Sequence, residues 1–276
     1  MVDESGPEPV QIEHLLGIVR RLRDPDQGCP WDVGQTFQSI VPHTLEEAYE
    51  LADAIESNDF DQIREEAGDV LFQVLFYAQM ADEKQHFNFA DVVDGLSEKL
   101  IRRHPHVFSR NSTAQQETPI AVSDVSDSWE KIKRIERQRK HQPGILDDIP
   151  LNLPALTRAQ KIQKRAARVG FDWADVAGVF EKLEEEICEL KEALVEGEEA
   201  AIKSELGDVL FCVVNLARHL DFDAETAMRG ATKKFEGRFR LMEEQAIASG
   251  SRLEDESVST LEARWQTAKR DLSQIE

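Results

Sequence analysis

Apolar residues recur along most of the chain at spacings of three and four positions, with polar residues between them. Leu45, Ala48 and Ala52 follow this spacing, and Val70 and Val74 continue it further along the chain. A period near 3.6 residues is typical of amphipathic helices, and the strict alternation of a half-buried strand is nearly absent. We therefore predict an all-α protein.

Polar segments divide the helical pattern. Thr44, with Glu47 three positions later, predicts a capped helix start, and the short polar run at residues 57–59 predicts a turn. Residues 109–127 are polar and predict a loop, while residues 129–140 have the composition of a charged helix. The pattern therefore describes a series of helices joined by short polar connections.

The two sides of a proline-rich segment, residues 141–154, repeat each other. Three prolines and one glycine make this segment a predicted linker between an N-terminal domain, residues 1–140, and a C-terminal domain, residues 155–276. A shift of 139 positions carries Glu46, Glu47, Glu50, Leu51, Glu66, Gly68, Asp69, Val70, Leu71, Phe72 and Val74 onto Glu185, Glu186, Glu189, Leu190, Glu205, Gly207, Asp208, Val209, Leu210, Phe211 and Val213. With slightly smaller shifts, Lys99, Arg103 and Trp129 match Lys234, Arg238 and Trp265. We predict two tandem copies of one helical-bundle domain, because this period is far longer than that of solenoid repeats.

The charge of the chain limits its partners. The formal net charge is −21, which argues against a nucleic-acid polymer or an anionic membrane as partner, because like charges repel. The apolar runs are far shorter than the roughly 18 residues of a membrane-spanning helix, and the first residues do not resemble a secretion signal. Three scattered cysteines do not form a disulfide framework or a paired-cysteine zinc site. We expect a cytoplasmic protein.

Acidic residues lie beside the apolar stripe in both copies of the repeat. Glu46 and Glu50 share one helix face, and Glu66 and Asp69 are three residues apart on the next helix. Residues equidistant from the turn near Asn58 face each other in an antiparallel hairpin, so these carboxylates are predicted to converge. Two carboxylates about 5 Å apart repel by roughly 3 kcal/mol at an effective dielectric constant near 20. A divalent cation with oxygen ligands, Mg²⁺ or Mn²⁺, relieves this repulsion, and the alternative is a pair of solvated helix faces that never converge.

The same residues carry a resemblance to a known family. Glu46-Glu47-x-x-Glu50 followed by Glu66-x-x-Asp69, and the matching second set, resemble the EExxE…ExxD signature of all-α nucleoside triphosphate pyrophosphohydrolases. GCPWDVGQT, KLIRRHPHVF, AQKIQKRAARVGFDW, GDVLFCVVNLARHL and KKFEGRF are similar to the two-domain MazG family. The resemblance implies Mg²⁺-dependent hydrolysis of a nucleoside triphosphate to the monophosphate and pyrophosphate by a homodimer.

The resemblance also assigns site residues in both domains. In the second domain it implies metal-binding and catalytic roles for Glu186, Glu189, Glu205 and Asp208, with Glu185 beside them to ligate or to orient water. In the first domain the corresponding metal ligands are Glu47, Glu50, Glu66 and Asp69, with Glu46 beside them.

Cations and an aromatic residue complete the predicted nucleotide site. Lys182 lies one turn before Glu186, and Lys234 with Arg238 forms a basic pair that is able to hold phosphate oxygens. Trp265 is the candidate for stacking on the base, with Trp129 as its counterpart. His43 replaces Lys182 in the first domain, so we expect the second domain to be the stronger hydrolase.

Two alternatives stand beside this interpretation. Glu65-Glu66-Ala67-Gly68 mimics the end of a Nudix box, but three fixed positions upstream do not match, which excludes that class. A helical dimeric regulatory module that binds metal or nucleotide without turnover stays open. The sequence shows no hydrogen-bonding pattern for a base, so we expect broad use of nucleoside triphosphates, and a role in clearing nucleotide pools or in nucleotide signalling stays open as well.

Overall fold

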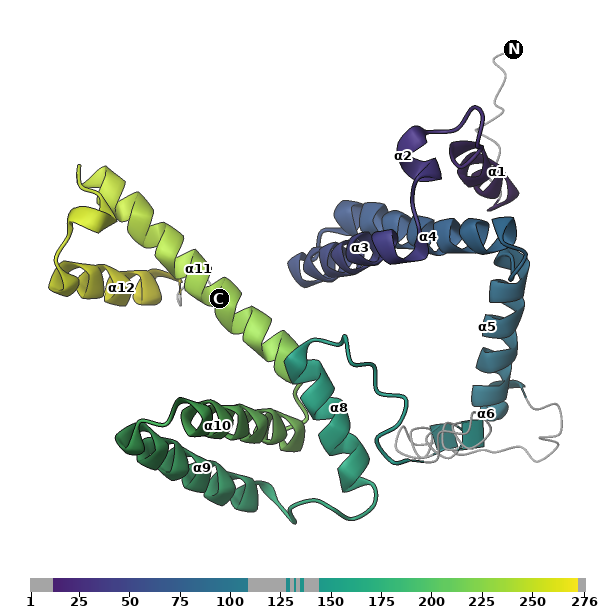
Figure 1. Ribbon diagram of the computed structural model, residues 1–276. Coiled ribbons are helices and arrows are strands. Elements are labelled where there is room, and N and C mark those ends of the chain that lie inside the picture. Colours follow the sequence, from purple (N-terminus) through teal and green to yellow (C-terminus); the bar gives the residue numbers. More distant parts are fainter. Residues whose placement is uncertain (1–11, 109–127, 130–131, 133–134, 137–143, 273–276) are drawn as a thin grey trace. The chain divides into compact units, whose positions relative to one another are not determined.

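Helices form all the regular structure that the computed structural model describes (Figure 1). The description covers residues 12–108, 128–129, 132, 135–136 and 144–272. Within these ranges the prediction of an all-α protein is confirmed, and no helix there is long and apolar enough to cross a membrane. The predicted loop at residues 109–127 and most of the predicted helix at residues 129–140 lie outside the described residues.

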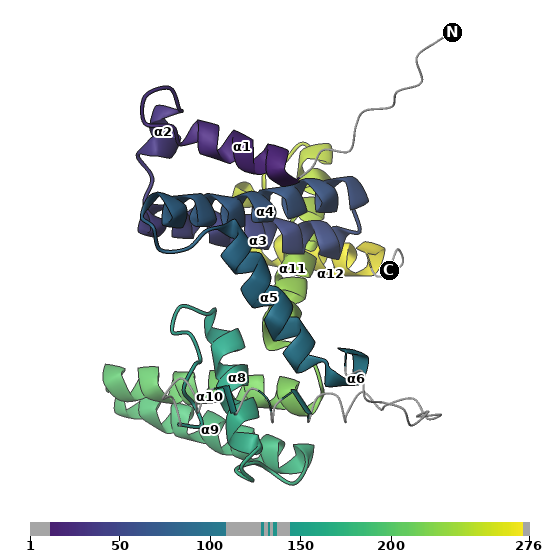
Figure 2. The same cartoon turned by 90° about the vertical axis from the view of Figure 1, so that its right-hand side faces the viewer.

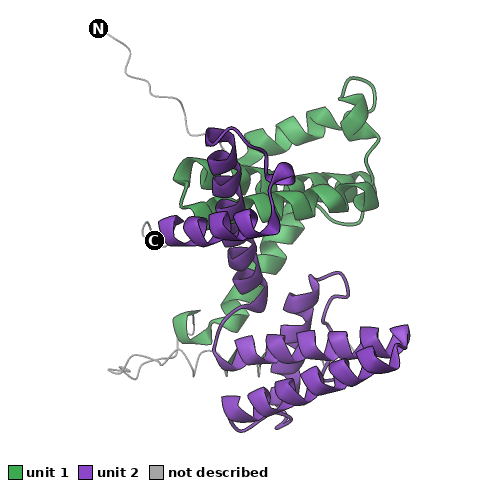
Figure 3. Ribbon diagram, turned by 90° about the vertical axis from the view of Figure 1, so that its left-hand side faces the viewer, with its two compact units in different colours: residues 1–132 green, residues 133–276 purple. Residues whose placement is uncertain are grey.

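Internal contacts divide the chain into unit 1, residues 1–132, and unit 2, residues 133–276 (Figure 3). The helices of unit 1 are α1 (Ile12–Leu22), α2 (Pro30–Val33), α3 (Phe37–Ser57), α4 (Phe60–Glu83), α5 (Phe89–Arg103) and α6 (Pro105–Phe108). Those of unit 2 are α8 (Ala155–Ala167), α9 (Val176–Glu196), α10 (Glu199–His219), α11 (Ala224–Ala248), the short 3₁₀ helix η1 (Leu253–Asp255) and α12 (Val258–Leu272).

Each unit contains an antiparallel hairpin of two long helices, α3 with α4 and α9 with α10 (Figures 1 and 2). The first hairpin turns at Asn58, which adopts the left-handed conformation with φ of 55°, and Asp59 then caps α4 by accepting from two backbone N–H groups. The second turns at Gly197, with φ of 77°. Both residues suit this conformation, because Asn and Gly tolerate positive φ better than other residues. The turn predicted at residues 57–59 is therefore confirmed.

The predicted helix start at Thr44 is wrong, because α3 begins seven residues earlier at Phe37. Thr36 is the N-cap: its hydroxyl accepts from the backbone N–H of Ser39 at 3.1 Å, and the Ser39 hydroxyl accepts from the N–H of Thr36 at 2.8 Å. Pro42 lies inside the first turns of α3, where its missing N–H removes one helical hydrogen bond. The Thr44 hydroxyl instead donates to the carbonyl of Ile40 at 3.1 Å.

The core of unit 1 lies where α1 and α3 pack on the second half of α4. Val19, Ile40, Leu75, Phe76 and Met80 form it, and each is at most 3% exposed. Burying side chains of this size is worth about 1.5–3 kcal/mol each, so this cluster fixes the position of α1 and of the N-terminal half of α3.

A short loop between α1 and α3 carries α2 and is held by Arg23. The Arg23 guanidinium donates to both carboxylate oxygens of Glu83, at 2.8 and 2.7 Å, and to the backbone carbonyl of Asp32 at 2.5 Å. It also lies over the ring of Phe76, 5.1 Å from the ring centre. The ion pair holds the pKa of Glu83 below its usual range. Because one guanidinium joins α2 to the end of α4, the loop is fixed to the core.

In unit 2, α8 ties the end of α10 to the start of α11. The Gln160 amide donates to the carbonyl of Phe222 at 2.8 Å, and its oxygen accepts from the N–H of Ala224 at 3.0 Å. Asp172 forms an ion pair with Arg218, which holds the pKa of Asp172 below its usual range. These contacts fix the α9–α10 hairpin to α8 and to the loop that follows it.

The chain then folds back on itself, since α12 lies along α11 (Figure 1). Arg264 of α12 closes the turn by donating to Glu256 at 2.6 and 2.5 Å and to the hydroxyl of Ser249 at 2.7 Å. Hydrogen bonds from Arg264 and Ser251 hold the pKa of Glu256 below its usual range. The ion pair therefore sets the register of α12 against α11.

We expect Gly28→Ala to lower the free energy of unfolding by about 1–3 kcal/mol, the usual cost of overpacking. The added Cβ would lie 2.4 Å from the carbonyl oxygen of Leu22 and 2.5 Å from that of Asp24. Gly17→Ala is the matched control: it lies in α1 with open space at the Cβ position, and should gain about 0.5–1 kcal/mol. Urea denaturation followed by circular dichroism measures both, and equal effects would contradict the close approach at Gly28.

Candidate functional site

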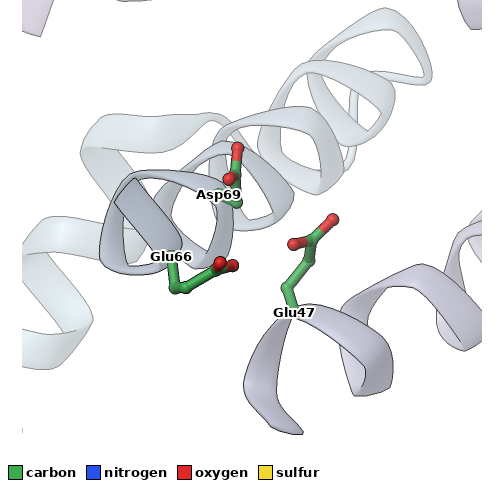
Figure 4. Close-up of side chains that lie close together, drawn as sticks. All are labelled: Glu47, Glu66 and Asp69. Carbon is green, nitrogen blue, oxygen red and sulfur yellow. The ribbon is translucent and has the colours of Figure 1, made fainter. Parts of the chain in front are cut away.

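Three carboxylates of unit 1 meet between the two helices of its hairpin. Glu47 of α3 points toward Glu66 and Asp69 of α4 (Figure 4), and oxygens of the three groups lie within 4.8 Å of one another. Oxygens on opposite sides of one Mg²⁺ ion are about 4 Å apart. The three carboxylates are therefore close enough for one small divalent cation to contact all of them.

Unit 2 repeats this cluster at the positions that the shift of 139 predicts. Glu186 of α9 lies with Glu205 and Asp208 of α10, again with oxygens within 4.8 Å. Glu47 and Asp69 are equidistant from Asn58, and Glu186 and Asp208 are equidistant from Gly197. These groups thus come together because residues at equal distances from the turn face each other across the hairpin.

Glu50 and Glu189 are outside the three-carboxylate groups, although their charges act on them. Burial raises the pKa of Glu47, and repulsion by Asp69, then by Glu50 and the other nearby glutamates, raises it further. The pKa of Glu189 is raised by burial first and by Glu186 next. The neighbouring carboxylates therefore disfavour the ionised forms of Glu47 and Glu189.

Lys182 offsets part of this charge in unit 2. Its Nζ lies 2.8 Å from a carboxylate oxygen of Glu185 and 2.8 Å from one of Glu186. The two hydrogen bonds raise the pKa of Lys182 above its usual range, so the ammonium stays charged. In unit 1 the corresponding contact is between Nδ1 of His43 and Glu46, at 3.5 Å, and histidine contributes charge only when it is protonated.

The residues behind the two clusters differ, and the sequence analysis did not single them out. In unit 1 the hydroxyl groups of Thr44 and Tyr77 share a hydrogen bond at 2.9 Å, and buried Gln73 lies beside them, 3.5 Å from Thr44. The shift of 139 replaces these residues with Leu183, Leu216 and Cys212. Burial raises the pKa of the Cys212 thiol, and the nearby negative charge of Glu186 raises it further. Only a comparison of the repeats position by position reveals this difference.

The other predicted nucleotide-binding residues lie on α11 and α12. The Arg238 guanidinium is 5.8 Å from the ring centre of Trp265, and the ring of Phe235 lies 5.2 Å from that of Trp265. Within the described part of unit 2, no hydrogen bond or ion pair joins Lys234, Arg238 or Trp265 to Glu186. The structure therefore groups Arg238 with Trp265 but does not place them against the carboxylates of their own unit.

Two tryptophans of unit 1 have different surroundings. Trp129, the counterpart of Trp265, packs edge-to-face against His104 with ring centres 5.1 Å apart. Trp31 of α2 is 54% exposed and contacts His43, with ring centres 5.7 Å apart. The sequence analysis did not single out Trp31, and its place in the GCPWDVGQT motif was the available signal.

Comparisons with known proteins agree with the repeat. A family model described as the MazG nucleotide pyrophosphohydrolase domain matches residues 35–108 and 174–240. The nucleoside triphosphate pyrophosphohydrolase of Escherichia coli K12 is 51% identical over 264 residues, which are 94% of this chain and 97% of that protein. The nucleoside triphosphate pyrophosphohydrolase/pyrophosphatase MazG of Thermotoga maritima is 44% identical over 260 residues, 94% of this chain and 96% of that protein. Each matched segment of the family model contains one carboxylate cluster.

We expect Glu47→Gln to raise the thermal midpoint of unit 1 at pH 7 in the presence of EDTA. The folded-state pKa of Glu47 is raised above 4.5, so its favourable contribution is fully present below pH 4.5 and is lost as the pH rises through the folded-state value. Scanning calorimetry from pH 4 to pH 8 should therefore show a gain for the variant that disappears at the acidic end.

Glu65→Gln is the control for this experiment, because Glu65 is an exposed carboxylate of α4 outside the cluster. Added Mg²⁺ should stabilise the wild-type protein more than Glu47→Gln. If Glu47→Gln has no gain in thermal midpoint at pH 7, or the same gain as Glu65→Gln, the proposed repulsion between the carboxylates of the cluster is contradicted.

Proposed function

The chain belongs to the MazG family of nucleotide pyrophosphohydrolases, and we propose that the carboxylate cluster of unit 2 is its main site of hydrolysis. The Escherichia coli and Thermotoga maritima relatives, which match nearly the whole length, are nucleoside triphosphate pyrophosphohydrolases, and the chain shares this activity. The observation that carries the proposed site is the convergence of Glu186, Glu205 and Asp208, with Lys182 bonded to its edge.

The donor set of the cluster fits a hard divalent cation. All three groups are carboxylates, and their oxygens lie within 4.8 Å of one another, which suits Mg²⁺, with Mn²⁺ as a substitute. We assign Glu186, Glu205 and Asp208 to hold the ion, with Glu189 as a further ligand. When bound, Mg²⁺ supplies positive charge that neutralises the triphosphate and the charge that develops during hydrolysis.

The protein's own residues then position and deprotonate the attacking water. The oxygen of this water forms a bond to the α-phosphorus, the bond to the bridging oxygen of the β-phosphate breaks, and pyrophosphate leaves. Glu185, which lies at the edge of the cluster and is not among the assigned ligands, orients the water and accepts its proton. Lys182 binds the phosphate oxygens beside Glu185, because its ammonium already lies at this edge of the cluster.

The remaining contacts of the nucleotide are assigned to α11 and α12. Lys234 and Arg238 lie one turn apart and hold phosphate oxygens, and Trp265 stacks on the base. Stacking on an indole tolerates every base, since each base has a π face. This arrangement supports hydrolysis of many nucleoside triphosphates, with unit 1 as the weaker site because His43 replaces Lys182.

An exposed apolar face on α10 supports a homodimer. Leu206, Leu210 and Val213 share one side of the helix and are 45–48% exposed. Side chains at this spacing form a continuous stripe along a helix, and a contiguous exposed stripe of large apolar residues marks an interaction surface. A second copy of the chain covers this stripe in the proposed dimer.

We expect Asp208→Asn to reduce turnover more than about 100-fold, because replacing a direct metal ligand costs more than replacing the residues that support it. Asp69→Asn is the matched change in unit 1 and should retain most of the activity. Ion-exchange analysis of ATP, dTTP and dUTP incubated with Mg²⁺ should show monophosphate and pyrophosphate as the products. Equal losses in the two variants would contradict the assignment to unit 2, and orthophosphate as the product would contradict the proposed bond.

We expect Leu210→Glu to convert the dimer to a monomer in sedimentation velocity, because a buried unpaired carboxylate opposes association. Leu151→Glu is the control, since Leu151 is 80% exposed and lies outside the helices of the hairpin. A wild-type protein that sediments as a monomer at every concentration would contradict the proposed dimer.

A further inference from the structure

Trp31 is an exposed indole on a firmly fixed support. A single exposed aromatic residue is common on protein surfaces, so its exposure of 54% is not informative by itself. The contacts that fix the loop around Trp31 are more informative than its exposure. Arg23 joins the carbonyl of Asp32 to Glu83, the N–H of Cys29 donates to the carbonyl of Leu22 at 2.9 Å, and Pro30 fixes the first residue of α2. These contacts therefore fix the backbone that carries the indole.

The indole lies at the end of the acidic face of α3. His43, Glu46 and Glu47 share this face, and Nδ1 of His43 is 3.5 Å from the carboxylate of Glu46. The rings of Trp31 and His43 meet edge-to-face, 5.7 Å apart and inclined by 69°. His43 precedes Glu47 by one helical turn, about 6 Å along the axis. An aromatic ring, an imidazole and the carboxylate cluster therefore follow one another along the start of α3.

The second repeat has no indole at the equivalent position, although Phe171 and Trp173 lie close by and are 78% and 40% exposed. The shift of 139 places Gly170 at the position of Trp31. The nearby Trp173 packs closely over Gly178, where an added Cβ would lie 2.4 Å from the indole ring. Trp129, the counterpart of Trp265 in unit 1, packs against His104 beyond the end of α5. Unit 1 thus has an aromatic residue of its own beside its cluster, on a different element from the one that the repeat predicts.

We propose that Trp31 is the platform for the nucleobase of a nucleotide bound at the cluster of unit 1. The base stacks on the indole, the ribose spans the region of His43, and the phosphates reach the cation held by Glu47, Glu66 and Asp69. The site takes a nucleoside triphosphate with little preference for the base, since an indole offers a stacking surface but the contact reads no hydrogen-bonding pattern. This inference rests on the proposed function of the clusters as metal-nucleotide sites.

The test uses the full chain carrying Asp208→Asn, so that nucleotide binding at unit 1 dominates. Equilibrium dialysis with Mg²⁺ compares α,β-methylene ATP, which resists hydrolysis at the bond in question, with inorganic triphosphate, which has no base. Trp31→Ala should weaken binding of the nucleotide about 5- to 150-fold, the usual effect of losing one stacked base, and leave binding of inorganic triphosphate unchanged. Trp31→Phe should restore most of the affinity.

Two control variants separate the possible outcomes. Phe60→Ala removes another aromatic residue of unit 1, which is 80% exposed, and should leave the binding of both ligands unchanged. Asp69→Asn should abolish binding of both ligands at unit 1. If Trp31→Ala weakens the binding of both ligands equally, or of neither, the proposed stacking of the base on Trp31 is wrong, and the proposed metal site of unit 1 is unaffected. If Asp69→Asn changes the binding of neither ligand, the proposed metal site of unit 1 is wrong, and so is the proposed role of Trp31, which depends on it.

Discussion

The mutual repulsion of carboxylates across a helical hairpin is the constraint on which the rest of this structure depends. Like charges held within 4.8 Å of one another oppose folding, and only rigid backbone on both sides keeps them there. The left-handed residues Asn58 and Gly197 set which residues face each other, and the packed core under α4 and the contacts of α8 with α10 hold the helices in that register. The acidic clusters are therefore a property of the hairpin geometry, and a cation is the component that removes their cost.

The sequence predicted this geometry well because it depends on local rules. Helical periodicity, a turn residue and equal distances from that turn were enough to predict that acidic residues of the two hairpin helices converge. That argument used Glu46 and Glu50 of the first helix, whereas the group in the structure contains Glu47. The start of α3 was predicted incorrectly, because Thr44 with Glu47 matches the usual capping box, whereas the observed cap pairs Thr36 with Ser39 and leaves Pro42 inside the helix. The position of Trp31 could not be predicted either, because it depends on Arg23, which bonds to Glu83, 60 positions away in the sequence. Long-range contacts of this kind leave no periodic signal.

Duplication has left two sites with the same carboxylates and different supporting residues. Thr44, Tyr77 and Gln73 place hydroxyl and amide groups beside one another in unit 1, and the shift of 139 replaces these residues with Leu183, Leu216 and Cys212. Unit 2 instead has a buried amide from another helix, because Gln163 of α8 donates to the carbonyl of Phe211 at 2.8 Å. The same acidic residues are therefore supported by different side chains in the two hairpins.

The contact between Lys182 and Glu186 has a consequence for ion selection. A tethered ammonium already sits beside the carboxylates of unit 2, 2.8 Å from two of them, so any ion that enters competes with a resident positive charge. A monovalent ion such as K⁺ that replaced the ammonium would exchange one positive charge for another and gain little electrostatic energy. A divalent ion adds a net charge and frees the lysine for a second anion. The lysine therefore favours divalent over monovalent ions at this cluster.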